Sequence, residues 1–234
     1  MNIETFTDLS FGTNTYLVWN EGSKEALLID AGLATNMILE FLKQEGLQLD
    51  AILITHAHPD HIGGAIDLCG RPAFPNARYV LSELEWEFWT AARTDLSPLR
   101  VPDAAKQSIN STARRCLGPL RHQIEPIDRE TEVVPGVAAI PAPGHTPGHL
   151  AVLIASEGQY LLNLGDAAVH PLHLEQPSWQ NGFDLAPDRA LVTRRQLMER
   201  AVADDMHLMA FHFPFPSIGR VTAKNGGWLW TPGW

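Results

Sequence analysis

Histidine and aspartate side chains crowd one short stretch of the sequence, LITHAHPDHIGG at residues 53–64. It follows an apolar run that is typical of a buried strand. In an extended segment, side chains two positions apart point to the same side, so His56 and His58 can bind one metal ion together. The proline after His58 bends the chain, so that Asp60 and His61 can turn toward a second ion. The spacing therefore predicts a metal site in this stretch.

Later apolar runs of the sequence also end on potential metal ligands. These are His145 after residues 137–142, Asp166 after residues 159–164 and His212 at the end of residues 207–212. In layered α/β architecture, loops at one end of a sheet share an edge, so donors that are distant in sequence can converge. The predicted ligand sets are His56, His58 and His145 for one ion and Asp60, His61 and His212 for the other, with Asp166 as a bridge.

This donor set predicts the chemistry of a metal hydrolase. Imidazole and carboxylate without thiolate suit zinc, manganese, cobalt or iron, with zinc as the default. Two such ions would make hydroxide available at neutral pH for attack on a carbonyl or phosphoryl centre, and one would polarise the substrate oxygen. The predicted catalytic carboxylates are Asp60 and the bridging Asp166. Asp60 would accept a proton or relay it to the leaving group. The sequence has no GxSxG motif, so a serine nucleophile is not expected.

Composition and charge limit the classes of function. The chain has 234 residues with 17 Lys+Arg against 27 Asp+Glu, a formal net charge of −10, which disfavours a nucleic-acid partner. No apolar run of about 18 residues occurs, so neither a membrane span nor a membrane partner is expected. Cys69 and Cys116 lack CxxC spacing and are expected to be reduced thiols. The first residues do not resemble a signal peptide, so a cytoplasmic location is predicted.

The pattern of the chain predicts one α/β domain over residues 1–234. Strands are expected at residues 13–19, 25–32, 50–58, 77–82, 137–144, 149–156, 159–166 and 207–212, with a terminal hairpin element at residues 225–230. Helices are expected at residues 36–44, 65–69 and 188–203. Ser82 and Glu85 suggest a capping box at the start of a helix. Residues 83–124 are interpreted as a helical insertion over the active site.

Four motifs taken together resemble the metallo-β-lactamase-fold hydrolases. They are HAHPDH at 56–61, GHTPGH at 144–149, LGD at 164–166 and the late histidine of FHFPFP at 211–216. The resemblance covers nearly the whole chain and implies a four-layer αββα sandwich. In that family the matching positions are the ligands of two metal ions, and an aspartate matching Asp30 supports the site from behind. Thr55 and His149 are candidates for a similar supporting role.

Subfamily features point to more than one substrate class. HFPFPSIGRV at 212–221 and QPSW at 176–179 resemble the methyl parathion hydrolase and lactonase-like group, which implies hydrolysis of lactones, esters and organophosphate triesters. GTNTYLVW at 12–19 is equally similar to glyoxalase II-type thioesterases. Many homoserine-lactone lactonases carry a tyrosine three residues after the bridging aspartate, where this chain has Val169. A lactonase or esterase is therefore expected, with a thioesterase or a mono-iron persulfide dioxygenase-like enzyme as alternatives.

Aromatic residues flank the metal-bearing motifs and predict the character of the substrate. The candidate cleft residues are Trp86, Trp89, His170, Trp179, Phe183, Phe213 and Phe215. Aromatic residues are often core, and His170 is equally well explained as an ordinary loop residue. An aromatic-lined cleft suits a small apolar acyl or aryl substrate. The resemblance also allows a homodimer.

Overall fold

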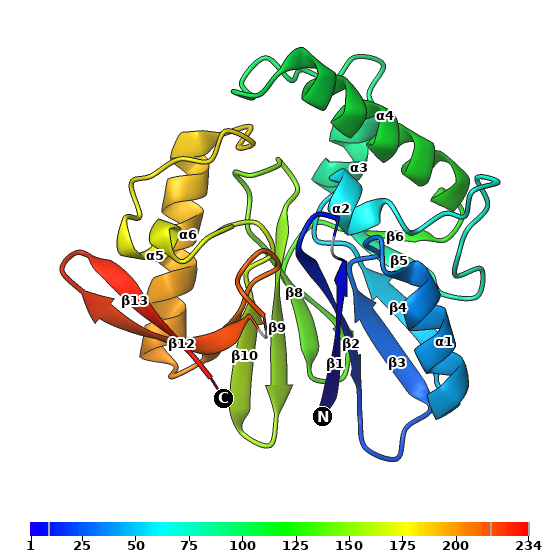
Figure 1. Ribbon diagram of the computed structural model, residues 1–234, viewed down its shortest axis with the longest axis horizontal. Coiled ribbons are helices and arrows are strands. Elements are labelled where there is room, and N and C mark those ends of the chain that lie inside the picture. Colours follow the sequence, from blue (N-terminus) through cyan, green and yellow to red (C-terminus); the bar gives the residue numbers. More distant parts are fainter. Residues whose placement is uncertain (9, 216, 234) are drawn as a thin grey trace. The chain divides into compact units, whose positions relative to one another are not determined.

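The computed structural model describes residues 1–8, 10–215 and 217–233 of the chain. It divides into two compact units, one formed by Met1–Thr94 with Pro102–Asp128 and the other by Asp95–Val101 with Arg129–Trp234. We call them the first unit and the second unit. Each contains one β-sheet with its own helices (Figure 1). That the chain is a single domain stays a prediction.

The sheet of the first unit has the strand order β1-β2-β3-β4-β5-β6 (Figure 1). Its strands are β1 (Asn2–Asp8), β2 (Thr13–Trp19), β3 (Glu25–Ile29), β4 (Gln48–Leu53), β5 (Arg78–Ser82) and β6 (Ile124–Ile127). The first three strands are antiparallel neighbours, whereas β3, β4, β5 and β6 run parallel to one another. The carboxyl ends of β3, β4 and β5 therefore meet at one edge of this sheet.

The helices of the first unit connect its parallel strands. They are α1 (Thr35–Glu45), α2 (Pro59–Ile62), α3 (Glu83–Thr90) and α4 (Asp103–Leu120). Helix α1 buries Ile38 and Leu42, which lie four positions apart on one face, and it ends at Gly46 in the left-handed conformation. Helix α4 contacts both α2 and α3. Residues 83–124 contain α3 and α4, while their interpretation as an insertion over an active site stays a prediction.

The sheet of the second unit has the order β13-β12-β11-β10-β9-β8-β7. Its strands are β7 (Thr131–Val134), β8 (Val137–Pro141), β9 (Leu150–Ser156), β10 (Gln159–Asn163), β11 (His207–Met209), β12 (Ile218–Lys224) and β13 (Gly227–Pro232). Strands β8, β9 and β10 are successively antiparallel, and β11 runs parallel to β10. Strands β8, β10 and β11 consequently point the same way, and the loops that follow them lie at one edge.

One hydrophobic core holds the second unit together. It joins Leu162 of β10 and Leu208 of β11 to Met198 of α6 (Pro187–Ala203) and to Phe213. The short helix α5 (Leu172–Glu175) packs against β13. At about 25 cal/mol per Å² of buried apolar surface, such a cluster is the main source of stability for the elements around it. The loops after these strands are therefore held on a rigid support.

The expected strands are confirmed, with small shifts at their ends, but two local predictions are wrong. Residues 65–69 form bends and turns with an isolated bridge between Ile66 and Pro72, and not the expected helix. The helical turn is α2, which starts at Pro59 in the HAHPDH motif and ends at Ile62. Proline at the first helical position is favoured because its missing N–H has no partner there anyway. Ser82 is the N-cap of α3 but makes no side-chain cap hydrogen bond, and the Glu85 carboxylate bonds to Ala57 and Trp89.

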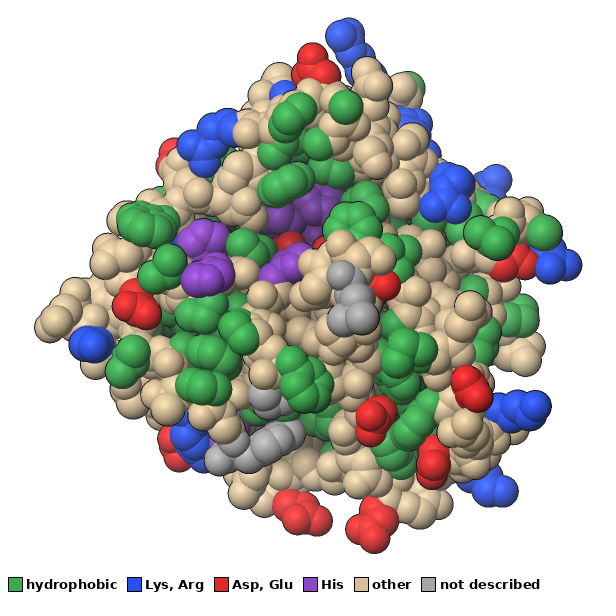
Figure 2. All heavy atoms as spheres, in the orientation of Figure 1, with side chains coloured by type: hydrophobic (Ala, Val, Ile, Leu, Met, Phe, Trp, Pro, Cys, Tyr) green, Lys and Arg blue, Asp and Glu red, His purple; other side chains and the backbone are tan. Residues whose placement is uncertain are grey.

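Charged side chains are dispersed over the surface. On the face in Figure 2, Lys and Arg side chains lie singly among Asp and Glu side chains. Arg71 pairs with Asp67, for example, and Arg78 with Glu125. Exposed ion pairs of this kind contribute little to stability. Cys69 and Cys116 are free, as expected, and the helices in the described ranges include none that is long and apolar enough to cross a membrane.

Candidate metal centre

The first unit gathers four potential ligands at the edge where its parallel strands end. His56 and His58 leave β4 in extended conformation, and Asp60 and His61 lie on α2. The ring centroids of His56 and His58 are 4.6 Å apart, and those of His56 and His61 are 4.0 Å apart. The three imidazoles are almost completely buried, whereas Asp60 is half-buried. The sequence prediction that these side chains lie together is thus met within this unit.

A buried carboxylate, Asp30, stands directly behind this group. Its Oδ2 lies 2.8 Å from Nδ1 of His61, and its Oδ1 accepts the backbone N–H of Thr55 at 2.7 Å. The hydroxyl of Thr55 donates to Asp30 and lies 3.2 Å from Nδ1 of His56. Burial raises the pKa of Asp30, while the attraction of His61 opposes the shift. A carboxylate on Nδ1 fixes the imidazole so that Nε2 is the nitrogen that can bind a metal.

The backbone keeps Asp30 and α2 in register. The N–H of Asp30 donates to Leu53, at the end of β4, and the N–H of Ala31 donates to the carbonyl of His61 at 2.8 Å. Gly64 donates to Ala31, and a Cβ at Gly64 would lie only 1.9 Å from the carbonyl oxygen of Gly32. Any larger residue would push these segments apart. Position 64 therefore requires glycine, because its backbone lies so close to that of Gly32.

Glu85 is a supporting residue that the sequence prediction did not assign to the site. Its side chain is fully buried on α3, and its Oε1 accepts the backbone N–H of Ala57 at 2.9 Å and the indole N–H of Trp89 at 2.7 Å. Ala57 lies between His56 and His58, so Glu85 holds the backbone that sets the spacing of both imidazoles. The only signal in the sequence was a glutamate among the aromatic residues of ELEWEFWT.

The second unit gathers the remaining predicted ligands. His145 follows β8, Asp166 follows β10 and His212 follows β11. Oδ2 of Asp166 lies 3.4 Å from Nε2 of His145 and 3.3 Å from Nε2 of His212. His145 and Asp166 are buried, whereas His212 is partly exposed. One carboxylate therefore faces two imidazole nitrogens, as expected for a bridging ligand.

His149 holds the backbone of Asp166. Its Nε2 accepts the backbone N–H of Asp166 at 2.9 Å, and its Nδ1 lies 3.1 Å from the carbonyl oxygen of Ala142. Because Nε2 accepts, the proton belongs on Nδ1, and the imidazole is neutral in this arrangement. The supporting role expected of His149 and Thr55 from the sequence stays a prediction.

Asp184 and Arg194 are two further residues that the sequence prediction missed. Oδ1 of Asp184 lies 3.0 Å from Nδ1 of His145. Arg194 is almost fully buried on α6 and donates to the carbonyls of Ala167 and Trp179 at 2.7 and 2.8 Å. Burial lowers the pKa of Arg194, and the attraction of Asp184 opposes this shift. Asp184 lies in irregular structure before α6, and Arg194 lies within α6.

The aromatic residues expected to line a cleft fall into two groups. Trp179, Phe183 and Phe215 are 52, 41 and 69 % exposed, and Trp86 is half-buried. Trp89 and Phe213 are buried, so their assignment to the cleft is wrong: Trp89 packs beside His58, and Phe213 packs on Trp230. The exposed His170 accepts the N–H of Leu172 at the start of α5, in agreement with the loop alternative.

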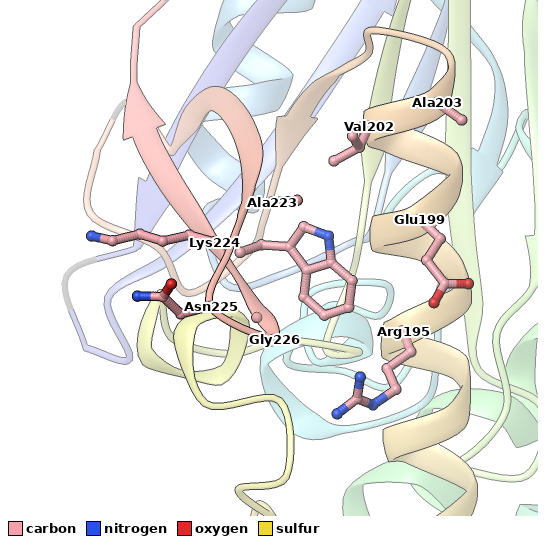
Figure 3. A pocket seen from close by; sticks show the side chains of 10 residues that line it. Arg195, Glu199, Val202, Ala203, Ala223, Lys224, Asn225 and Gly226 are labelled. Carbon is pink, nitrogen blue, oxygen red and sulfur yellow. The ribbon is translucent and has the colours of Figure 1, made fainter.

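A cavity of about 530 Å³ in the second unit is a separate feature. In Figure 3, Arg195 and Glu199 of α6 line one side, and Lys224, Asn225 and Gly226 of the β12–β13 hairpin line the other. The guanidinium of Arg195 lies 6.0 Å from the ring centroid of Trp228. None of the predicted metal ligands is among the described residues that line this cavity.

The chemistry of the donors fits divalent metal ions. Each predicted ligand belongs to a group of His and Asp side chains able to hold a metal ion. One imidazole in each unit, His61 and His145, has a buried carboxylate on Nδ1. This carboxylate–histidine arrangement is the usual support of a metal-bound imidazole. With nitrogen and oxygen donors and no thiolate, the set suits zinc, manganese, cobalt or iron.

Sequence comparison agrees with this donor chemistry. Residues 10–202 match the family model described as the metallo-beta-lactamase superfamily. The chain is 34% identical over 167 residues to the uncharacterized protein YobT of Bacillus subtilis, covering 70% of this chain and 65% of YobT. It is 30% identical over 190 residues to the N-acyl homoserine lactonase of Bacillus thuringiensis, covering 77% of this chain and 65% of that enzyme. The chain thus spans less than two thirds of the length of these relatives.

Structural comparison gives the same result. AidC, a dizinc quorum-quenching lactonase solved with the product N-hexanoyl-L-homoserine, matches with a TM-score of 0.82 and 25% identity over 94% of this chain and 79% of AidC. The fold class expected from the sequence is confirmed. From the family model and the relatives, the chain belongs to the metallo-β-lactamase superfamily.

Proposed function

We propose that this chain is a dinuclear metal hydrolase that opens a lactone or cleaves an ester. One observation carries the proposal: in each unit one imidazole of the predicted ligand set, His61 or His145, has its Nδ1 on a buried carboxylate. The names of the relatives support the lactone as substrate, because the Bacillus thuringiensis enzyme is an N-acyl homoserine lactonase and AidC is a lactonase.

In this proposal the donors of both units bind two divalent ions together. His56, His58 and His145 would hold one ion and Asp60, His61 and His212 the other, with Asp166 as the bridging ligand. Zinc is the proposed metal. Two such ions supply Lewis acidity and lower the pKa of bound water toward neutrality.

The protein residues then position the reaction. The pairs of His61 with Asp30 and of His145 with Asp184 hold the ligand nitrogens in place, and His149 fixes the backbone of Asp166. Asp60 is half-buried, with its Oδ2 3.5 Å from Nε2 of His61, and is proposed to pass a proton to the leaving group.

The exposed aromatic side chains Trp179, Phe183 and Phe215 are proposed to contact an apolar acyl or aryl part of the substrate. Phosphotriesters are proposed as secondary substrates. The finer likeness to methyl parathion hydrolase and to glyoxalase II, the homodimer and the cytoplasmic location stay predictions.

Metal analysis and a substrate panel test the proposal. Protein purified without chelator should contain two divalent ions per chain and should hydrolyse an acyl homoserine lactone or an aryl ester faster than paraoxon or S-lactoylglutathione. Asp166→Ala should abolish this activity because the bridging carboxylate is lost, and Asp188→Ala, at an exposed position on α6, is the matched control. A single iron per chain, a preference for the thioester, or substantial turnover by Asp166→Ala would contradict the proposal.

A further inference from the structure

The carboxylate of Asp184 is held against His145 by the backbone as well as by its side chain. It is 2 % exposed, and its Oδ2 accepts the backbone N–H of Asn181 at 3.2 Å. The next two residues donate their backbone N–H groups to the segment that carries His145: Leu185 to the carbonyl of His145 at 3.0 Å and Ala186 to that of Gly144 at 2.9 Å. The distance between Asp184 and His145 is therefore set by three separate contacts.

The N-terminal turn of α6 reinforces this arrangement. Gly144 has a φ of +140°, and a Cβ built there would lie 2.3 Å from the backbone nitrogen of Ala190. Thr193, on the same helix, donates its hydroxyl to the carbonyl of Pro143. The helix thus packs directly on the residues that precede His145, and Arg194 follows Thr193 on it.

Arg194 connects α6 to two points of the segment that precedes this helix in the chain. Its Nε donates to the carbonyl of Ala167, the residue after Asp166, and its Nη1 donates to the carbonyl of Trp179. Its charge is attracted by Asp184. One buried guanidinium therefore contacts the backbone beside one proposed ligand and interacts with the carboxylate that supports another.

Stability alone is a poor explanation for these buried charges. Burial of a charged side chain costs free energy, because the charge loses its hydration. Arginine, however, offers a rigid fork of donors that can hold two carbonyls in one geometry. The hydrogen bonds of Arg194 therefore suit a role in fixing the backbone at Ala167 and Trp179.

We propose that Asp184 and Arg194 are positioning residues for the metal ligands of the second unit. Asp184 accepts the Nδ1–H of His145 and directs Nε2 to the metal, and Arg194 holds the backbone at Ala167, after Asp166, and at Trp179. The inference rests on the proposed function for the identity of the ions, but the tautomer of His145 can be measured without them.

Asp184→Asn tests the first part. The amide has one oxygen acceptor where the carboxylate has two. Its NH₂ group must therefore face either Nδ1 of His145 or the backbone N–H of Asn181, and the contact that it faces is not preserved. Chelator competition should show affinity lowered about 10- to 100-fold for one of the two ions, with a changed visible spectrum of the cobalt-loaded protein. In metal-free protein, ¹⁵N NMR of the ring should show His145 protonated on Nδ1 in the parent and a mixed or altered tautomer in the variant. Asp188→Asn should match the parent in every measurement.

Arg194→Lys and Arg194→Met test the second part. Lysine lacks the fork of donors that reaches both carbonyls, so hydrogen exchange at residues 167–179 should increase. Methionine donates to neither carbonyl, so hydrogen exchange should increase further and metal affinity should fall as well. The control is Arg195→Met. Arg195 is the next residue of α6 and lines the separate cavity, so this change should leave metal affinity and hydrogen exchange unchanged.

The outcomes separate this inference from the proposed function. A parent protein that binds two ions, with an Asp184→Asn variant of equal metal affinity and unchanged His145 tautomer, would overturn the inference alone. Parent values of metal affinity and of hydrogen exchange at residues 167–179 in Arg194→Met would overturn the role of Arg194. A parent protein that binds no divalent ion would overturn the proposed function, while the NMR measurement would still decide the role of Asp184.

Discussion

At the scale of single residues, the hydrogen-bond partner of Nδ1 distinguishes two candidate ligands, His61 and His145, from His173. His61 and His145 have a buried carboxylate on Nδ1, which favours a fixed tautomer with Nε2 as the metal-binding nitrogen. His173 differs: no hydrogen-bond partner of its Nδ1 lies among the described residues, and burial, with the nearby charge of Arg194, lowers its pKa to about 4. His173 is therefore a neutral, partly buried side chain.

This difference predicts a pH dependence of stability. The unfolded chain takes up a proton on His173 near pH 6.5, whereas the folded chain does so only near pH 4, so stability should fall as the pH drops between these values. His173→Gln removes this contribution. Urea unfolding of metal-free protein at pH 7, 6 and 5 should show a smaller loss for the variant than for the parent.

The exposed His122 provides the control for that comparison. His122→Gln should lose as much stability on acidification as the parent. A His173→Gln variant whose stability falls in parallel with that of the parent would show that His173 takes up its proton equally well in the folded chain.

At the scale of elements, α3 supports the loop that carries His56 and His58. The helix presents Glu85 to the backbone N–H of Ala57 and to the indole of Trp89, and the Trp89 ring packs 5.8 Å from the His58 ring. A helix outside the motif thus sets the position of residues inside it.

Removal of this carboxylate should destabilise the protein. Glu85→Leu leaves two buried N–H donors without their acceptor, at about 1–3 kcal/mol for each unsatisfied group. Urea denaturation should show the loss, and hydrogen exchange should show faster opening at Ala57. Glu87→Leu, at an exposed position of the same helix, is the control and should have a much smaller effect. Equal stability of the two variants would refute the supporting role of Glu85.

At the scale of the whole molecule, the proposed ions link segments that are far apart in the sequence. Their ligands extend from His56 to His212 and belong to both compact units. With a formal net charge of −10, the chain also has acidic side chains in excess, and bound cations would offset part of that charge. Metal binding should therefore stabilise the native chain as a whole.

Chelation tests this coupling. A ligand that binds only the native state adds about 2.7 kcal/mol of stability at a free concentration of 100 times its Kd. Calorimetry should show a lower Tm after metal removal, with recovery when zinc is added back. Asp166→Ala should show a smaller shift between the two conditions. A Tm independent of metal would contradict the proposed ligand set.

The sequence by itself predicted most of the strands and the helices α1 and α6, because these depend on local patterns, but it missed β1, β6, β7 and β12. A run such as TNTYLVW specifies a buried strand through its residue types, and HAHPDH specifies donors through its spacing. The same locality explains the errors. The capping-box interpretation of Ser82 and Glu85 failed because tertiary contacts with Ala57 and Trp89 compete for the same carboxylate.

Only the tertiary structure revealed the supporting residues. Asp184 lies 39 positions from His145, and Glu85 lies 28 positions from Ala57. Nothing in their neighbouring sequence marks them, because a contact between distant segments depends on strand order and loop path. For the same reason the structure, and not the sequence, decided that Trp89 and Phe213 belong to the core while Trp179, Phe183 and Phe215 remain exposed.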